Sequence, residues 1–492
     1  MNVARHGYKV ELTQEAVERI NRSRAVVDEF VDSKKTIYGI TTGFGKFSDV
    51  AISKEDTEEL QRNLIISHAC GVGNPLDTEV VIGIMLLRVN NIAVGHSGVR
   101  LSTVQTLVDM INKGVHPIVP EKGSLGASGD LAPLSHVVLT MIGEGEAEFG
   151  GVRMTGREAM EKAGIPLVVL TSKEGLGLIN GTQVMTSVGA LAVYDAIQLM
   201  KLSDIACALT AEALNGITDA FDPRIHAIRP HQGQMTSAAN LLRILADSGL
   251  TTRQGEIRVQ DAYTLRCTPQ IHGASKDAVN YCLQKVEIEI NAVTDNPLVF
   301  PEDKVVFSGG NFHGQPMALT FDFLGIALAE IANVSERRIE RLVNPQLSGL
   351  PAFLTEKGGL HSGFMIAQYA AAALVSENKV LAHPASVDSI PSSANQEDHV
   401  SMGTIAARKA REILDNVRNV LAIELLSGAQ GVDFKDPAKL GKGTREAYAA
   451  VRARVPRLAE DRVMYHDIDA VYALVKDHSI VKAVEKAVGS LQ

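Results

Sequence analysis

The sequence PMALTFDFLGIALAEIANVSERRIERLVN, at residues 316–344, is the clearest structural signal in this chain. Pro316 stands at its first position, where a helix tolerates proline, and Pro345 follows its last residue. Apolar residues between the two prolines recur at helical spacing, at Leu319, Phe323, Ile326, Leu328, Ile331 and Val334. The pattern predicts one long helix of about 43 Å, at ~1.5 Å per residue.

Several other segments predict helices of similar length. They cover residues 182–215, 275–293, 362–381 and 400–426. The first 180 residues differ, because short apolar runs alternate there with glycine-rich turns such as GITTGFG at 39–45. We therefore expect a mainly α fold, with a smaller N-terminal domain at 1–180 that is rich in loops and short elements, and a bundle of long helices at 181–492.

Composition excludes several classes of protein. The 492 residues carry a net charge of −9, which argues against a nucleic-acid binder, and 45% hydrophobic with 21% charged residues argues against disorder. The four cysteines form no C-x-x-C pair and the first twenty residues are polar, which predicts a reducing, cytoplasmic location. The longest uncharged run, 358–376, contains His361 and Gln368 and is typical of a packed helix, so we expect no membrane span.

The segment GSLGASGDLAPLSH, at 123–136, is the first candidate for chemistry. It does not fit a serine-hydrolase elbow, because Asp130 stands where G-x-S-x-G requires the second glycine. It also lacks the G-K-[ST] ending of a phosphate-binding loop. On composition alone it is an ordinary flexible loop.

Its core, Ala127-Ser128-Gly129, resembles the self-processing triad of the aromatic amino acid ammonia-lyases. These enzymes form the electrophile 4-methylidene-imidazol-5-one (MIO) from their own backbone. The Gly129 nitrogen would attack the Ala127 carbonyl to close a ring, and Ser128 would lose its hydroxyl to leave the exocyclic methylidene. Glycine at 129 keeps the attacking nitrogen unobstructed.

The resemblance extends over almost the whole chain. Further matching motifs are YGITTGFG (38–45), NLIISHACG (63–71), LINGTQ (178–183), VQDAYTLRC (259–267), TDNPL (294–298), GGNFHG (309–314) and SANQEDHVSM (393–402). The Ser67-His68 pair, and Glu397 where phenylalanine-type enzymes usually carry glutamine, are similar to the histidine-specific members. A carboxylate suits an imidazole substrate, because the imidazole can donate an N–H and a phenyl ring cannot.

The resemblance implies roles for two tyrosines and their neighbours. Tyr263 and Arg266 are three residues apart and would share one helical face, Tyr263 as base for the β-proton and Arg266 as clamp on the substrate carboxylate. A free tyrosine has a pKa of about 10, so a neighbouring guanidinium would have to lower it. Tyr38 would be a second phenol in the site, and Asn180 would form a hydrogen bond near the MIO carbonyl. Without the resemblance, a Tyr/Arg pair is more often a structural contact.

The substrate side would include His68 against the imidazole, Phe312 as an apolar wall and Gln260 as a polar contact. Glu397 would bind and polarise the imidazole. Glu397-Asp398-His399 also permits a metal-site hypothesis, but consecutive residues rarely converge on one ion, so we expect no metal.

The resemblance thus implies elimination of ammonia from L-histidine to give trans-urocanate, with MIO formed autocatalytically and no external cofactor. It also implies a homotetramer whose sites are shared between subunits, and no membrane partner. A phenylalanine or tyrosine ammonia-lyase or an aminomutase is the alternative on the same scaffold. A metal-dependent hydrolase and a non-catalytic helical assembly protein are the alternatives from other classes.

Overall fold

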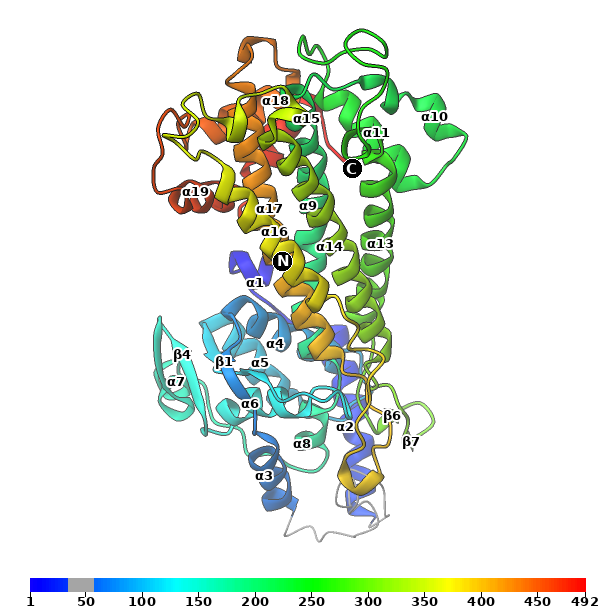
Figure 1. The fold of residues 1–492 in the computed structure, drawn as a ribbon. Coiled ribbons are helices and arrows are strands. Elements are labelled where there is room, and N and C mark those ends of the chain that lie inside the picture. The colour runs from blue at the N-terminus through cyan, green and yellow to red at the C-terminus, as the bar shows by residue number, and fades with distance from the viewer. Residues whose placement is uncertain (34–56) are drawn as a thin grey trace. The chain divides into compact units, whose positions relative to one another are not determined.

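The computed structural model describes residues 1–33 and 57–492, and the chain forms two compact units (Figure 1). Unit 1 comprises residues 1–191, 284–322 and 384–408. Unit 2 comprises residues 192–283, 323–383 and 409–492. The boundary expected after residue 180 lies inside unit 1, and the division into 1–180 and 181–492 stays a prediction.

Long helices dominate the structure, as the sequence predicts. Those with residues in both units are α9 (Gln183–Ala213), α13 (Thr268–Glu289), α14 (Gln315–Val343) and α17 (Gly403–Val432). The 316–344 pattern placed α14 within one residue of its bounds. The expected mainly α fold with long helices is confirmed.

Unit 2 packs parts of these four helices around buried charges. Arg338 of α14 donates from Nε and Nη2 to both carboxylate oxygens of Glu424 on α17, at 2.5 and 2.9 Å. The Arg338 Nη1 lies 3.3 Å from Nε2 of His272 on α13, whose Nδ1 is 2.8 Å from an oxygen of Asp204 on α9. All four side chains are buried, so the pairs fix the helices against one another.

The remaining elements of unit 2 are shorter. They are η2 (Thr218–Phe221), α10 (Pro223–Ala227), α11 (Gln232–Ile244), α12 (Tyr263–Arg266), α15 (Pro345–Ser348), η3 (Ala352–Leu354), α16 (Met365–Leu381), η5 (Pro437–Lys439), α18 (Lys442–Arg452), α19 (Tyr465–Lys476) and α20 (Ser479–Val488). The packed helix expected within 358–376 is only partly buried, because α16 exposes 59% of Ile366 and 58% of Tyr369.

Unit 1 combines short helices with small antiparallel sheets. Its helices are α1 (Asn2–His6), α2 (Gln14–Asp32), α3 (Thr57–His68), α4 (Thr78–Ala93), α5 (Leu101–Lys113), α6 (Leu131–Met141), α7 (Gly156–Lys162), α8 (Glu174–Ile179) and η4 (Ser393–Asn395). Its strands are β1 (Val72–Pro75), β2 (Val115–Pro117), β3 (Pro120–Lys122), β4 (Glu146–Phe149), β5 (Val152–Thr155), β6 (Leu298–Phe300) and β7 (Val305–Phe307). The described sheets pair β1 with β3, β2 with β4 and β5, and β6 with β7. In Figure 1 α7 lies beside β4.

The helix α14 is apolar on more than one face. Phe321, Leu324 and Leu328 are fully buried, whereas Leu319 and Ile326 are 52% and 45% exposed. By length and composition α14 could cross a membrane, but 67% of its most apolar stretch is buried in the protein. The core helix of a folded domain has such burial.

Candidate active site

The Ala127-Ser128-Gly129 triad forms a tight turn between β3 and α6 in unit 1. Gly126 and Gly129 pair across it in an antiparallel bridge. Gly126, Ser128 and Gly129 all have positive φ, at 81°, 55° and 82°. A positive φ is uncommon for serine, so the surrounding chain holds this turn against the local preference of Ser128.

Gly129 has no space for a side chain. A Cβ there would lie 2.2 Å from the carbonyl oxygen of Gly181, which itself accepts a 2.8 Å hydrogen bond from the Asp130 amide. The Gly181 amide in turn donates to the Ser128 carbonyl at 3.3 Å. The segment at 178–183 therefore lies directly against the triad.

Asn180 stands at the end of α8, one residue before this contact. Its side chain is buried, and Oδ1 has no hydrogen-bond partner in the described part of the chain. A buried unpaired amide oxygen is costly and calls for an explanation. Asn180 is thus a polar group available next to the triad.

Asp130 is a site residue that the sequence analysis missed. It is fully buried, and burial raises the pKa of its carboxyl although four donors oppose this. The amides of Val184 and Met185 each donate to Oδ2 at 2.9 Å, and the hydroxyls of Ser124 and Thr404 donate to Oδ1. An aspartate before an apolar helix predicts an ordinary N-cap, which hides this role in the sequence.

Glu397 and His68 lie near the triad. The Ser128 hydroxyl donates to Glu397 Oε1 at 3.4 Å. Burial lowers the pKa of His68, and the charge of Glu397 acts against this shift, so the two groups are within electrostatic reach. His68 is the last residue of α3, and its Nδ1 lies 3.0 Å from the Ser67 hydroxyl.

A pocket of about 210 Å³ opens beside the triad. It is lined by Ser67, His68, Cys70, Gly123, Ser124, Leu125, Ala127, Gly129, Leu131 and Ala132. The structure thus brings His68 and the triad, predicted from separate motifs, to one cavity. A small molecule bound in this pocket would contact the imidazole of His68 and the triad, because both line the pocket.

Phe312 and His399 lie on two loops of unit 1 that meet. Phe312 is half-buried, and the next residue, His313, stacks on His399 with ring centroids 5.3 Å apart. In residues 1–33 and 57–492 no three side chains from His, Cys, Asp or Glu gather into a metal-binding group. The geometry gives no support to the metal hypothesis for Glu397-Asp398-His399.

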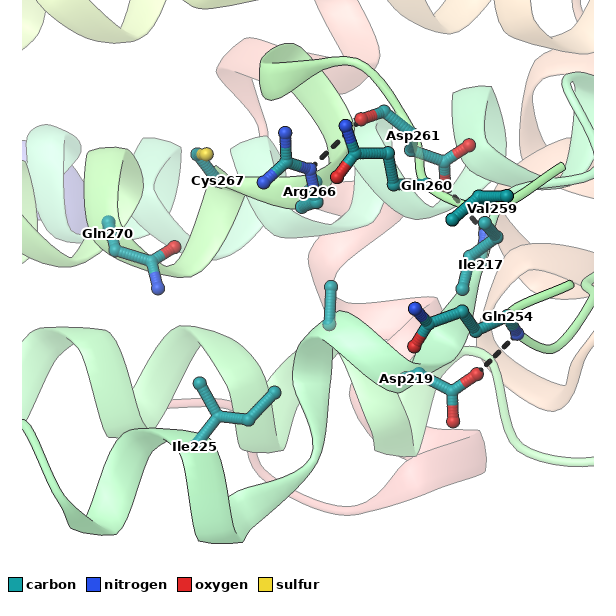
Figure 2. Close-up of a pocket in the computed structure, with 11 residues that line it drawn as sticks. Ile217, Asp219, Ile225, Gln254, Val259, Gln260, Asp261, Arg266, Cys267 and Gln270 are labelled. Carbon is teal, nitrogen blue, oxygen red and sulfur yellow. Dashed lines mark hydrogen bonds between the residues drawn. The ribbon is translucent and has the colours of Figure 1, made fainter.

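Gln260, Tyr263 and Arg266 belong to unit 2. Tyr263 and Arg266 share one face of α12, as predicted, with the guanidinium 4.9 Å from the centre of the phenol ring. Tyr263 is 69% exposed. Gln260 and Arg266 line two pockets of about 300 and 360 Å³, the first of which is shown in Figure 2.

Hydrogen bonds fix this part of unit 2. Arg266 Nε donates to the Asp261 carbonyl at 3.0 Å, and the Asp261 carboxylate accepts from the Ile217 amide at 2.6 Å (Figure 2). The predicted residues therefore form two partial sites, one in each unit. Tyr38 lies outside the described residues.

Comparisons with known proteins identify the family. The profile of the aromatic amino acid lyases matches residues 1–453. Histidine ammonia-lyase of Alkaliphilus oremlandii is 70% identical over 99% of this chain and 96% of that protein. Histidine ammonia-lyase of Clostridium tetani is 62% identical over 99% of this chain and 95% of that protein.

Solved structures agree. The crystal structure of histidine ammonia-lyase from Trypanosoma cruzi has a TM-score of 0.92 at 45% identity, covering 99% of this chain and 92% of that one. Tyrosine aminomutase from Streptomyces globisporus has a TM-score of 0.96 at 39% identity, covering 100% of this chain and 97% of that one. This chain therefore belongs to the aromatic amino acid lyase family.

Proposed function

We propose that this enzyme eliminates ammonia from L-histidine to give trans-urocanate. The observation that carries the proposal is the grouping of Glu397 and His68 at the Ala127-Ser128-Gly129 turn. A carboxylate can accept the ring N–H of histidine, and a site built for that hydrogen bond discriminates against a phenyl ring. The curated relatives at 62–70% identity that bear the name histidine ammonia-lyase support the same substrate.

The triad fits the MIO group. The turn presents Gly129 without a side chain, and a neighbouring polar atom, Asn180 Oδ1, has no hydrogen-bond partner among the residues that the structure describes. We propose that the Gly129 nitrogen bonds to the Ala127 carbonyl carbon with loss of water, and that Ser128 then loses its hydroxyl as a second water. The finished group would supply an electrophile that makes the substrate amine a better leaving group, with no external cofactor.

Within unit 1 we assign substrate binding to three residues. Glu397 accepts the imidazole N–H, His68 contacts the ring and Phe312 forms an apolar wall. The lowered pKa of His68 favours its neutral form, so it can both donate and accept a hydrogen bond at neutral pH. Asn180 forms a hydrogen bond at the processed triad.

Within unit 2 we assign Tyr263 to removal of the β-proton, Arg266 to the substrate carboxylate and Gln260 to a polar contact. The Arg266 guanidinium lies 4.9 Å from the centre of the Tyr263 ring, so the proposed base and the proposed carboxylate clamp are neighbours on α12. We assign Tyr38 to the site as a second phenol on resemblance alone.

We further propose a homotetramer with active sites shared between subunits. A base must be shielded from water, but Tyr263 is 69% exposed in the single chain. Phe323, Ile326, Ile366 and Tyr369 of unit 2 are large, apolar and at least 43% exposed, which favours a further protein surface over them. The described cysteines are all free, which supports a cytoplasmic location.

A tyrosine aminomutase is the second candidate, because a structure of that name has the TM-score of 0.96. The test is an absorbance time course in the near ultraviolet with L-histidine, L-phenylalanine and L-tyrosine in parallel, beside the Ser128→Ala variant. We expect urocanate from histidine alone, and none from the variant. Turnover of tyrosine or phenylalanine instead would retain the electrophile and refute the assignments of Glu397 and His68.

A further inference from the structure

Glu397 is held by a residue to which no role has been assigned so far. The Ser392 hydroxyl donates to Glu397 Oε2 at 2.8 Å, whereas Oε1 receives, from residues 1–33 and 57–492, only the longer 3.4 Å bond from Ser128. Ser392 and Glu397 also exchange both backbone hydrogen bonds, at 3.0 and 3.3 Å. Three contacts therefore join these two residues.

The loop that they close has an unusual backbone. Ser393, Ala394 and Asn395 all lie in the left-handed region, with φ of 53°, 53° and 66°. Three consecutive residues other than glycine adopt this conformation only when their surroundings impose it. The pairing of Ser392 with Glu397 is one such constraint, since it closes the loop at its base.

The two carboxylate oxygens of Glu397 differ in whether their hydrogen-bond donor remains after processing of the triad. Under the proposed function, processing of the triad removes the Ser128 hydroxyl, so Oε1 loses its donor. The Ser392 hydroxyl takes no part in processing and stays on Oε2. Oε1 then has no donor in the described part of the chain and can accept a hydrogen bond, while the bond to Oε2 fixes the direction of the carboxylate.

We propose that Ser392 is a positioning residue for substrate specificity: it holds Glu397 Oε2 so that Oε1 faces the ring N–H of the substrate. This inference rests on the proposed function. It assigns imidazole recognition to a serine and glutamate pair on one loop, with the glutamate as the contact and the serine as its support.

The test compares Ser392→Ala, Ser392→Thr and Ser389→Ala. Threonine retains the hydroxyl, and the extended backbone of Ser392, with φ −138° and ψ 177°, accommodates a β-branched residue. Ser389 is the matched control, because it lies on the same loop and its hydroxyl accepts the Val400 amide at 3.1 Å, not a contact of Glu397. Intact mass, as the loss of two waters, verifies processing in every variant.

Each variant is assayed for kcat and KM with L-histidine, and for inhibition by urocanate and by trans-cinnamate, which has no ring N–H. We expect Ser392→Ala to raise the histidine KM and the urocanate inhibition constant by roughly tenfold, with a smaller change in kcat. Cinnamate inhibition should stay the same, and both Ser392→Thr and Ser389→Ala should behave as the parent does.

A Ser392→Ala enzyme that is processed and binds urocanate as tightly as the parent overturns the proposal. So does an equal weakening of urocanate and cinnamate, which a merely structural role would produce. If the parent enzyme is processed but does not act on histidine, the proposed function itself fails, and the assignment of Ser392 falls with it.

Discussion

Replacing Gly129 by alanine tests the geometry of the triad. The new Cβ would lie 2.2 Å from the Gly181 carbonyl oxygen and 2.5 Å from its carbon, both backbone atoms. Backbone atoms cannot rotate away, so either the turn or the 178–183 segment must move. We therefore expect Gly129→Ala to destabilise unit 1 and to prevent processing of Ser128.

The expected loss of stability has two parts. A left-handed conformation costs an L-residue roughly 1–2 kcal/mol, and Gly129 has φ 82°. Overpacking of a filled interior costs a further ~1–3 kcal/mol. The free energy of unfolding should thus fall by about 2–5 kcal/mol in total.

Gly151→Ala separates these two parts. Gly151 lies in the hairpin between β4 and β5 with φ 77°, and a Cβ there would meet no atom within 4 Å. This control carries the conformational cost alone, about 1–2 kcal/mol. Urea unfolding followed by circular dichroism measures both variants, and intact mass reports whether two waters have been lost.

The result that refutes this reasoning is specific. If Gly129→Ala is no less stable than Gly151→Ala and still loses two waters, the contact with Gly181 does not restrict the triad. If Gly129→Ala is destabilised yet fully processed, the overlap is real but is unrelated to ring closure.

Two further predictions concern buried charges. Burial lowers the pKa of His272, so below about pH 6.5 the folded state binds fewer protons than the unfolded state. The free energy of unfolding should therefore decrease as the pH is lowered through this range, by at most ~1.4 kcal/mol per pH unit. Urea titrations between about pH 8 and pH 5 should show this slope, and it should be reduced in His272→Asn, which has no imidazolium to face Arg338. Lys173→Met leaves the buried Asp295 carboxylate without its 2.7 Å partner and should cost about 3–5 kcal/mol in unfolding assays. Lys304→Met, in an exposed ion pair, should cost about 0–1 kcal/mol, and equal losses in both lysine variants would contradict the burial argument.

The sequence predicted the long helices because their signals are local. Proline at each end and helical spacing placed α14 within one residue. Its neighbours could not be predicted in the same way: Phe321 is fully buried and Phe323 is 43% exposed, although both fit an apolar helix. When a helix is apolar on several faces, its sequence does not indicate which of these faces packs against the rest of the same chain.

In the candidate site, too, the residues with local sequence signals were predicted and those without them were not. The triad, His68 and Glu397 carry motifs that could be matched, and the described structure groups them in unit 1. Asp130 and Ser392 could not be found in this way, because an aspartate before a helix and a serine in a loop are common and have local explanations. Their roles depend on residues far along the chain or on a loop conformation.

The two carboxylates at the triad show why such roles follow from hydrogen bonding and not from residue type. Asp130 is fully buried, and both of its oxygens accept two hydrogen bonds each, so its lone pairs are taken by the protein. Glu397 is half-buried and accepts one hydroxyl on each oxygen from the described residues, of which the Ser128 hydroxyl would be lost in the proposed processing. Asp130 can therefore only fix the chain around the turn, whereas Glu397 retains an acceptor for a substrate. The number of unoccupied lone pairs thus favours a structural role for Asp130 and supports the proposed recognition role of Glu397.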